Sequence, residues 1–132
     1  MRANSKGAAP SIAAFQTKVC GWMDAVFGED GATDPKERAL RFLEEAIELA
    51  QAIGVKRQDV ERVCDYVCSR PAGEPVQEVG GVMITLAALC QKTDIDLQHA
   101  ALSEFERVDT ALLRNHIRSN QLNKRAAGLV AS

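Results

Sequence analysis

The sequence has no excess of basic residues and few aromatic ones. Its 16 Lys and Arg residues are outnumbered by 18 Asp and Glu residues, and aromatic residues make up 5% of the chain. Proteins that bind nucleic acid polymers use a basic excess to contact the phosphates. We therefore expect no polymeric nucleic acid partner, and any nucleic acid ligand should be as small as a nucleotide.

Long apolar runs are also missing. No uninterrupted apolar stretch approaches the length needed to span a bilayer, and the opening residues MRANSKGAAP have no apolar segment that could act as a signal peptide. We therefore expect no membrane partner and a cytoplasmic location.

Cysteines in a cytoplasmic protein are expected to be reduced. The chain has four, Cys20, Cys64, Cys68 and Cys90. Cys64 and Cys68 are one helical turn apart, which is a possible spacing for half a zinc site, but His99 and His116 are isolated and supply no second pair. We favour cysteines that pack as small hydrophobic residues over a zinc site.

Helical spacing of apolar residues dominates the rest of the chain. The 132 residues suit a single domain over 1–132, with loose tails at about 1–9 and 126–132. The pattern predicts an all-α fold of about five helices and no convincing strand. The expected helices cover about residues 11–27, 34–53, 57–69 and 76–92, and a last helix follows a cap at Asp96.

Signals at the helix ends support this division. Gly28 should end the first helix, and Asp34, Pro35 and Glu37 suit the start of the second. Gly54 can end the second helix in a left-handed conformation. The last helix should carry its apolar residues on one face, namely Leu97, Ala101, Phe105, Val108, Leu112 and Leu113.

The segment VQEVGGVMITLAALCQ, residues 76–91, is apolar nearly all round after its first turn. A helix of this kind is buried on most sides. In so small a domain we expect it to be both central and part of a subunit interface, so that oligomerisation completes the core. The pair Gly80 and Gly81 suggests close helix packing, because glycine weakens a helix and this cost is tolerated where two helices must approach each other closely.

Acidic residues gather on one side of the second predicted helix. Glu45 and Glu48 are about 60° apart at roughly 100° per residue, so their carboxylates can reach a common point. Glu44 lies beside them, and Glu78 opens the apolar helix that follows. Carboxylate oxygens are the ligands that Mg²⁺ prefers. A solvated acidic face paired with Arg38 and Arg41 is the alternative explanation.

The stretch RFLEEAIELAQAIG, followed by QEVGGVMITLAALC, resembles the MazG-like all-α nucleoside triphosphate pyrophosphohydrolases. Their pattern is Glu-Glu-x-x-Glu, a variable gap, and then Glu-x-x-Asp. Glu44, Glu45 and Glu48 match the first half and Glu78 opens the second, but Gly81 stands where the family has Asp. The resemblance covers roughly residues 12–108.

The resemblance implies hydrolysis of a nucleoside triphosphate to a monophosphate and pyrophosphate by a homodimer or homotetramer. Mg²⁺, with Mn²⁺ as a substitute, would be held by Glu45, Glu48 and Glu78. Glu44 would be the catalytic base or an outer-shell residue.

Substrate contacts are expected from residues outside the acidic set. Arg118 and Lys124 on the basic last helix correspond to cations of the family's terminal helix and would bind phosphate. Trp22 would stack on the base, although a core position is favoured for it, and Gln16 would contact base or phosphate. The alternative function is a catalytically degenerate MazG-like module that acts as a nucleotide-binding or interaction protein.

Overall fold

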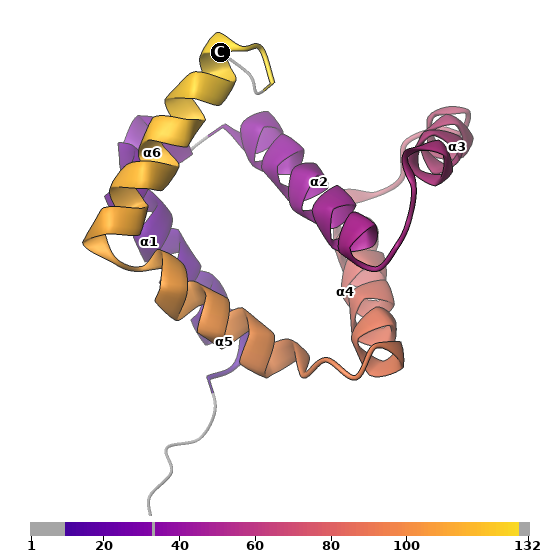
Figure 1. Cartoon of the computed structure of the whole chain (residues 1–132), viewed down its shortest axis with the longest axis horizontal. Coiled ribbons are helices and arrows are strands. Elements are labelled where there is room, and N and C mark those ends of the chain that lie inside the picture. Colours follow the sequence, from indigo (N-terminus) through magenta and orange to yellow (C-terminus); the bar gives the residue numbers. More distant parts are fainter. Residues whose placement is uncertain (1–9, 33, 130–132) are drawn as a thin grey trace, which may run out of the picture. The chain divides into compact units, whose positions relative to one another are not determined.

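The structure is a computed structural model that describes residues 10–32 and 34–129, without the side chains of residues 29–32. All regular elements in this part of the chain are α-helices, as expected (Figure 1). There are six of them, α1 (Ile12–Ala32), α2 (Pro35–Ala52), α3 (Arg57–Cys68), α4 (Pro75–Lys92), α5 (Leu97–Val108) and α6 (Ala111–Ala126).

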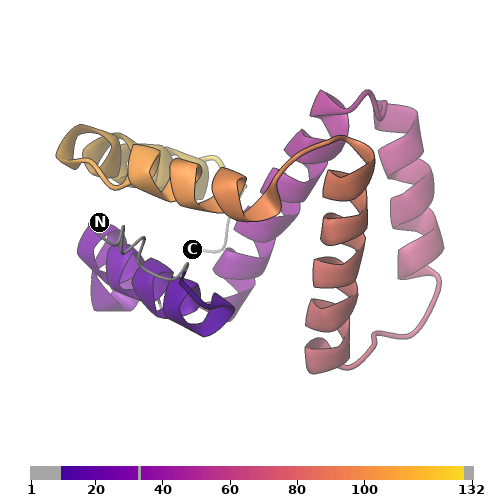
Figure 2. The same cartoon turned by 90° about the horizontal axis from the view of Figure 1, so that it is seen from below.

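The helices belong to two compact units. One consists of the described parts of residues 1–35 and 107–132, and in it α1 and α6 lie side by side, as two perpendicular views show (Figure 1, Figure 2). The other, residues 36–106, contains nearly all of α2, all of α3 and α4, and most of α5. Because the first unit uses segments from both halves of the chain, the two units are not consecutive domains.

Most of the expected helix boundaries are confirmed. Gly28 interrupts α1 with φ 73° and ψ 170°, so the regular first segment ends where the sequence predicted. Gly54 follows α2 with φ 99°, a conformation that L-residues rarely adopt. At the start of α5, the Asp96 carboxylate accepts a hydrogen bond from the backbone N–H of His99 at 2.8 Å, which is the predicted cap.

The expectation of one continuous last helix is wrong. The chain breaks at Asp109 and Thr110, which separate α5 from α6. Thr110 has extended backbone angles, and its hydroxyl accepts a hydrogen bond from the N–H of Leu113, so it caps a new helix. The break also removes Leu112 from the expected apolar face, because its side chain is 80% exposed.

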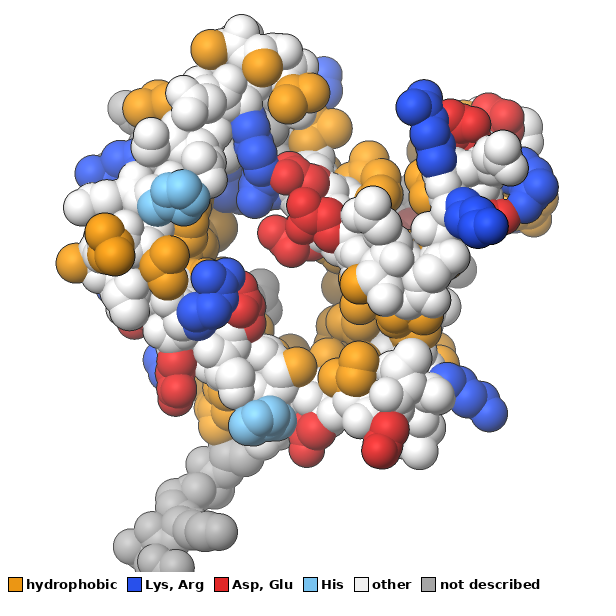
Figure 3. Space-filling model, in the orientation of Figure 1, with side chains coloured by type: hydrophobic (Ala, Val, Ile, Leu, Met, Phe, Trp, Pro, Cys, Tyr) orange, Lys and Arg blue, Asp and Glu red, His pale blue; other side chains and the backbone are white. Residues whose placement is uncertain are grey.

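Few apolar residues of the described chain are buried in either unit. Its buried apolar residues are Val26, Cys90 and Phe105. Within the described chain, residues 76–92 are not buried on most sides, since Val76 is 83% and Ile84 is 73% exposed. Hydrophobic side chains accordingly reach the surface over α4 (Figure 3). Within the described chain, α4 is therefore covered only in part. The subunit interface expected for this helix stays a prediction.

Candidate functional site

The acidic residues of the second predicted helix lie on α2, where acidic side chains are visible in Figure 3. Glu44 accepts a hydrogen bond from Nη1 of Arg41, and a carboxylate oxygen of Glu45 is 3.6 Å from Nη2 of the same guanidinium. Glu48 is exposed one turn further along. Arg41 therefore pairs with two of the carboxylates, as expected for a solvated acidic face. The side chain of Glu45 is still 68% exposed.

Glu78 lies in the first turn of α4, as expected, and its side chain folds back on the α3–α4 connection. A Cβ atom at residue 73 would collide with the Glu78 carboxylate, so only glycine leaves room for it there. The carboxylate also borders a shallow hollow together with Cys68 and Arg70. Gly73 thus allows the carboxylate its present position against the connection.

The donor chemistry of Glu45, Glu48 and Glu78 suits Mg²⁺, but their arrangement does not form a site in this structure. Within the part of the chain that is described, no three Asp, Glu, His or Cys side chains are placed to hold a metal ion together. Glu45 and Glu48 can approach each other because they are one turn apart on the exposed side of α2. A metal site made of all three carboxylates would require them to come together from these positions.

Gly81, which replaces the family's Asp, is an exposed residue of α4. A Cβ atom built at this position, or at Gly80, meets no other heavy atom within 4 Å. The glycine pair therefore does not serve close packing within the described chain, contrary to one expectation from the sequence.

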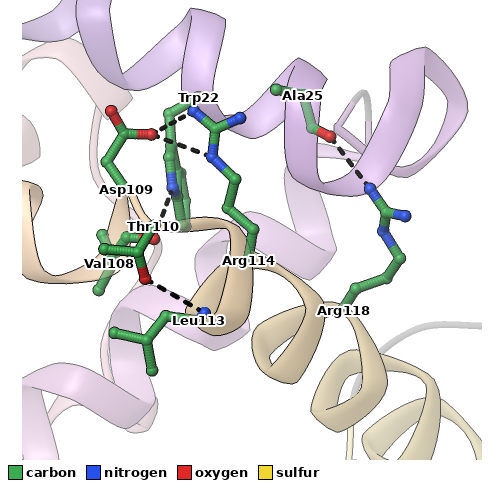
Figure 4. Close-up of polar contacts among 8 residues, drawn as sticks. All are labelled: Trp22, Ala25, Val108, Asp109, Thr110, Leu113, Arg114 and Arg118. Atoms are coloured by element: carbon green, nitrogen blue, oxygen red, sulfur yellow. Dashed lines mark hydrogen bonds and ion pairs between the residues drawn. The ribbon is translucent and has the colours of Figure 1, made fainter.

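Arg118 has a clear partner on α1. Its Nη2 donates to the backbone carbonyl oxygen of Ala25 at 3.0 Å (Figure 4). Its Nε donates to that of Val26. Because Gly28 ends the regular part of α1, these carbonyls lie in a terminal turn, where cations are favourable. The predicted phosphate contact of Arg118 stays a prediction, and it would compete with these bonds.

Trp22 lies in the same unit. Its Nε1 donates to the carbonyl oxygen of Val108 at 3.3 Å (Figure 4). Its ring meets that of Phe27 edge-on with centroids 6.0 Å apart. Trp22 is half-buried, so the core position that was favoured for it is reached only in part. Of the other predicted substrate contacts, Gln16 is exposed on α1 and Lys124 is half-buried on α6.

The cysteines only partly follow expectation. All four are free, and Cys90 is buried, but Cys20, Cys64 and Cys68 are exposed. The Sγ atoms of Cys64 and Cys68 are 4.0 Å apart. The hydrogen bond and the charge of Cys68 raise the pKa of the Cys64 thiol. The packing expectation therefore holds for Cys90 and is wrong for the other three in the single chain.

Gln121 was not singled out from the sequence. It is 5% exposed, and its amide nitrogen has no hydrogen-bond partner among the described residues. Such a group carries a desolvation cost. Nothing in the spacing of the polar run RNHIRSNQLNK distinguishes this glutamine from its exposed neighbours, so the sequence offered no signal for it.

No family model, characterised protein or solved structure matched this chain when it was compared with them. The described helices include none that is both long and apolar enough to cross a membrane. Any function therefore has to be argued from the residues themselves.

Proposed function

We propose that this protein is a Mg²⁺-dependent nucleotide pyrophosphohydrolase of the MazG-like type that works as a homo-oligomer. The observation that carries the proposal is the acidic edge of α2, where Glu44, Glu45 and Glu48 lie within little more than one turn. Mn²⁺ would substitute for Mg²⁺, and the substrate would be a nucleoside triphosphate.

The helical order supports the proposal. The acidic helix is followed by a short helix, a connection rich in Pro and Gly, and an apolar helix that starts with Glu78. The acidic helix, α2, carries the first half of the MazG-like sequence pattern. The apolar helix, α4, carries the start of the second half.

Each glutamate has a distinct role in this proposal. Glu45 and Glu48 would hold the metal from α2, and Glu78 would complete the set from α4. When bound, the metal would neutralise phosphate charge and lower the pKa of the attacking water. Glu44 would accept the proton of that water, and Arg41 would position Glu44 through the hydrogen bond that the two already share.

A second candidate function is supported by two specific observations. Gly81 removes a carboxylate from the family pattern, and Arg41 already engages both Glu44 and Glu45. A degenerate MazG-like module would keep the helical fold and bind nucleotides or a protein without hydrolysing a substrate.

A turnover assay separates the two candidates. The purified protein is incubated with a panel of nucleoside triphosphates and Mg²⁺ or Mn²⁺, and pyrophosphate is measured. Glu48→Gln should abolish release, since it removes a metal ligand. Glu61→Gln is the matched control, because Glu61 is an exposed glutamate of α3 that pairs with Arg57 outside the proposed site. No turnover by the wild type across the panel would favour the degenerate module.

A further inference from the structure

Two thiols lie side by side near the end of α3. Cys64 and Cys68 are both exposed, and their Sγ atoms are 4.0 Å apart. Residues four positions apart are neighbours on a helix surface, so α3 itself sets this separation. Cys68 is the last residue of the helix, and it also borders the hollow shared with Glu78. Solvent can therefore reach both sulfur atoms.

Burial does not explain this pair of cysteines. A free cysteine is commonly a small core residue, as Cys90 is in this chain. Cys64 and Cys68 instead belong to a helix that has no buried residue. A disulfide between them is disfavoured while α3 stays helical, because residues one turn apart have Cβ atoms about 5 to 6 Å apart and a disulfide requires about 3.5 to 4.5 Å. An ion placed between the two sulfur atoms avoids this strain.

A single metal ion fits between the two sulfur atoms. A zinc–thiolate bond is about 2.3 Å long and a copper–thiolate bond is similar, so two such bonds join sulfur atoms up to about 4.6 Å apart. The observed separation of 4.0 Å falls within this reach, and the backbone of α3 can stay as it is. The pair is therefore preorganised as a chelate with two sulfur ligands.

The number of ligands selects the kind of ion. Within the part of the chain that the structure describes, no third Asp, Glu, His or Cys joins Cys64 and Cys68 in a group that could hold a metal ion. Structural zinc sites use four protein ligands, and Mg²⁺ prefers oxygen. Cu(I) is a soft cation that thiolates select, and two thiolates satisfy it. A site of two thiolates thus favours Cu(I).

We propose that Cys64 and Cys68 bind one Cu(I) ion between their sulfur atoms. Each thiol gives its proton to solvent as its sulfur–copper bond forms, and the copper keeps its oxidation state. The site uses sulfur, whereas the carboxylates proposed to hold Mg²⁺ supply oxygen. The proposal therefore stands whether or not the protein hydrolyses nucleotides.

Competition with the chromogenic Cu(I) chelator bicinchoninate tests the site. The full chain is reduced, kept free of oxygen and titrated with Cu(I) in the presence of the chelator. The wild type should withdraw one Cu(I) per chain. Cys64→Ser and Cys68→Ser should each weaken binding by about a hundredfold or more, because the second sulfur–copper bond is then no longer intramolecular. Cys20→Ser leaves the pair intact and should bind as the wild type does.

A matched variant tests the spacing of the thiols and not their number. Tyr66→Cys combined with Cys68→Ser keeps two exposed thiols on α3, since Tyr66 is 61% exposed. Residues two positions apart do not face each other on a helix, so sulfur atoms at 64 and 66 cannot share an ion. This double variant should bind as weakly as Cys68→Ser. Circular dichroism should show retained helix in every variant, because α3 has no buried residue.

Three outcomes would overturn the proposal. The first is a wild type that takes no Cu(I) from the chelator. The second is a Cys64→Ser or Cys68→Ser variant that binds as tightly as the wild type. The third is a folded double variant that does so, which would show that any two exposed thiols suffice. Nucleotide turnover is measured separately and does not bear on these titrations.

Discussion

The guanidinium of Arg118 on α6 donates a hydrogen bond from Nη2 to the backbone carbonyl oxygen of Ala25 on α1, at 3.0 Å. A second bond, from Nε, reaches the carbonyl oxygen of Val26. Gly28 interrupts the helix just beyond these residues, so their carbonyls lie in the last turn of its regular part. Arg118 therefore stabilises the end of the regular part of α1 and links it to α6.

Replacing Arg118 by Ala should lower the free energy of unfolding by about 1 to 2 kcal/mol, because two hydrogen bonds from a charged donor are lost. Arg118→Lys should give an intermediate loss, since an ammonium does not reproduce the paired geometry. Denaturant unfolding followed by circular dichroism measures both effects.

The control for Arg118 is Arg57→Ala. Arg57 forms an exposed pair with Glu61 on α3, and a pair of this kind contributes about 0.5 kcal/mol or less. Equal stability of Arg118→Ala and wild type would show that the bonds to α1 do not hold the two helices together. In that case the residue would be available for the phosphate contact predicted from the sequence.

The reactivity of the Cys64 thiol at neutral pH tests how Cys68 affects the pKa of Cys64. The hydrogen bond and the negative charge of Cys68 both favour the protonated form of Cys64, and they raise its pKa. Cys68→Ala removes both influences, so the pKa of Cys64 should fall. Because the thiolate is the reactive form, alkylation of Cys64 at neutral pH should become faster.

Mass spectrometry of the alkylated peptides measures this rate for each cysteine. Cys20 is exposed on another helix, and its rate should not change in the Cys68→Ala variant. Cys90 is buried and should react only after unfolding. A slower reaction of Cys64 in the variant would contradict the proposed influence of Cys68.

Arg41 should oppose metal binding on α2. Its guanidinium engages Glu44 and Glu45, so a divalent cation has to compete with a positive charge that is already in place. Arg41→Gln should therefore tighten Mn²⁺ binding by about tenfold, measured by calorimetry. Arg57→Gln removes the same charge from α3 and should leave the affinity unchanged. Weaker binding by Arg41→Gln would mean that Arg41 organises the glutamates and does not compete for them.

Local signals in the sequence were sufficient for most of the fold. Gly28, Gly54 and Asp96 mark helix ends through backbone conformation or a side-chain cap, and both effects act within a few residues. The break at Thr110 could have been found in the same way, because Thr is a common cap residue. It was missed because apolar residues continue on both sides of it at helical spacing.

Burial and side-chain direction were not predictable in this way. The apolar composition of α4 indicated burial, but composition does not show whether the cover comes from the same chain or from another one. Spacing placed Glu45 and Glu48 on one side of α2. Residue spacing carried no information about the direction of the Glu78 side chain, which lies against the connection near Gly73. It also could not identify the partners of Arg118, which are more than 90 residues away in the sequence.

The central claim is that the acidic residues of α2 support hydrolysis between the α and β phosphates of a nucleotide. Quantifying all products formed from a nucleoside triphosphate with Mg²⁺ tests it most directly. We predict one monophosphate and one pyrophosphate for each triphosphate consumed, with no product from Glu48→Gln and normal yield from Glu61→Gln. Release of inorganic phosphate and a diphosphate, or equal turnover by Glu48→Gln and wild type, would contradict the account.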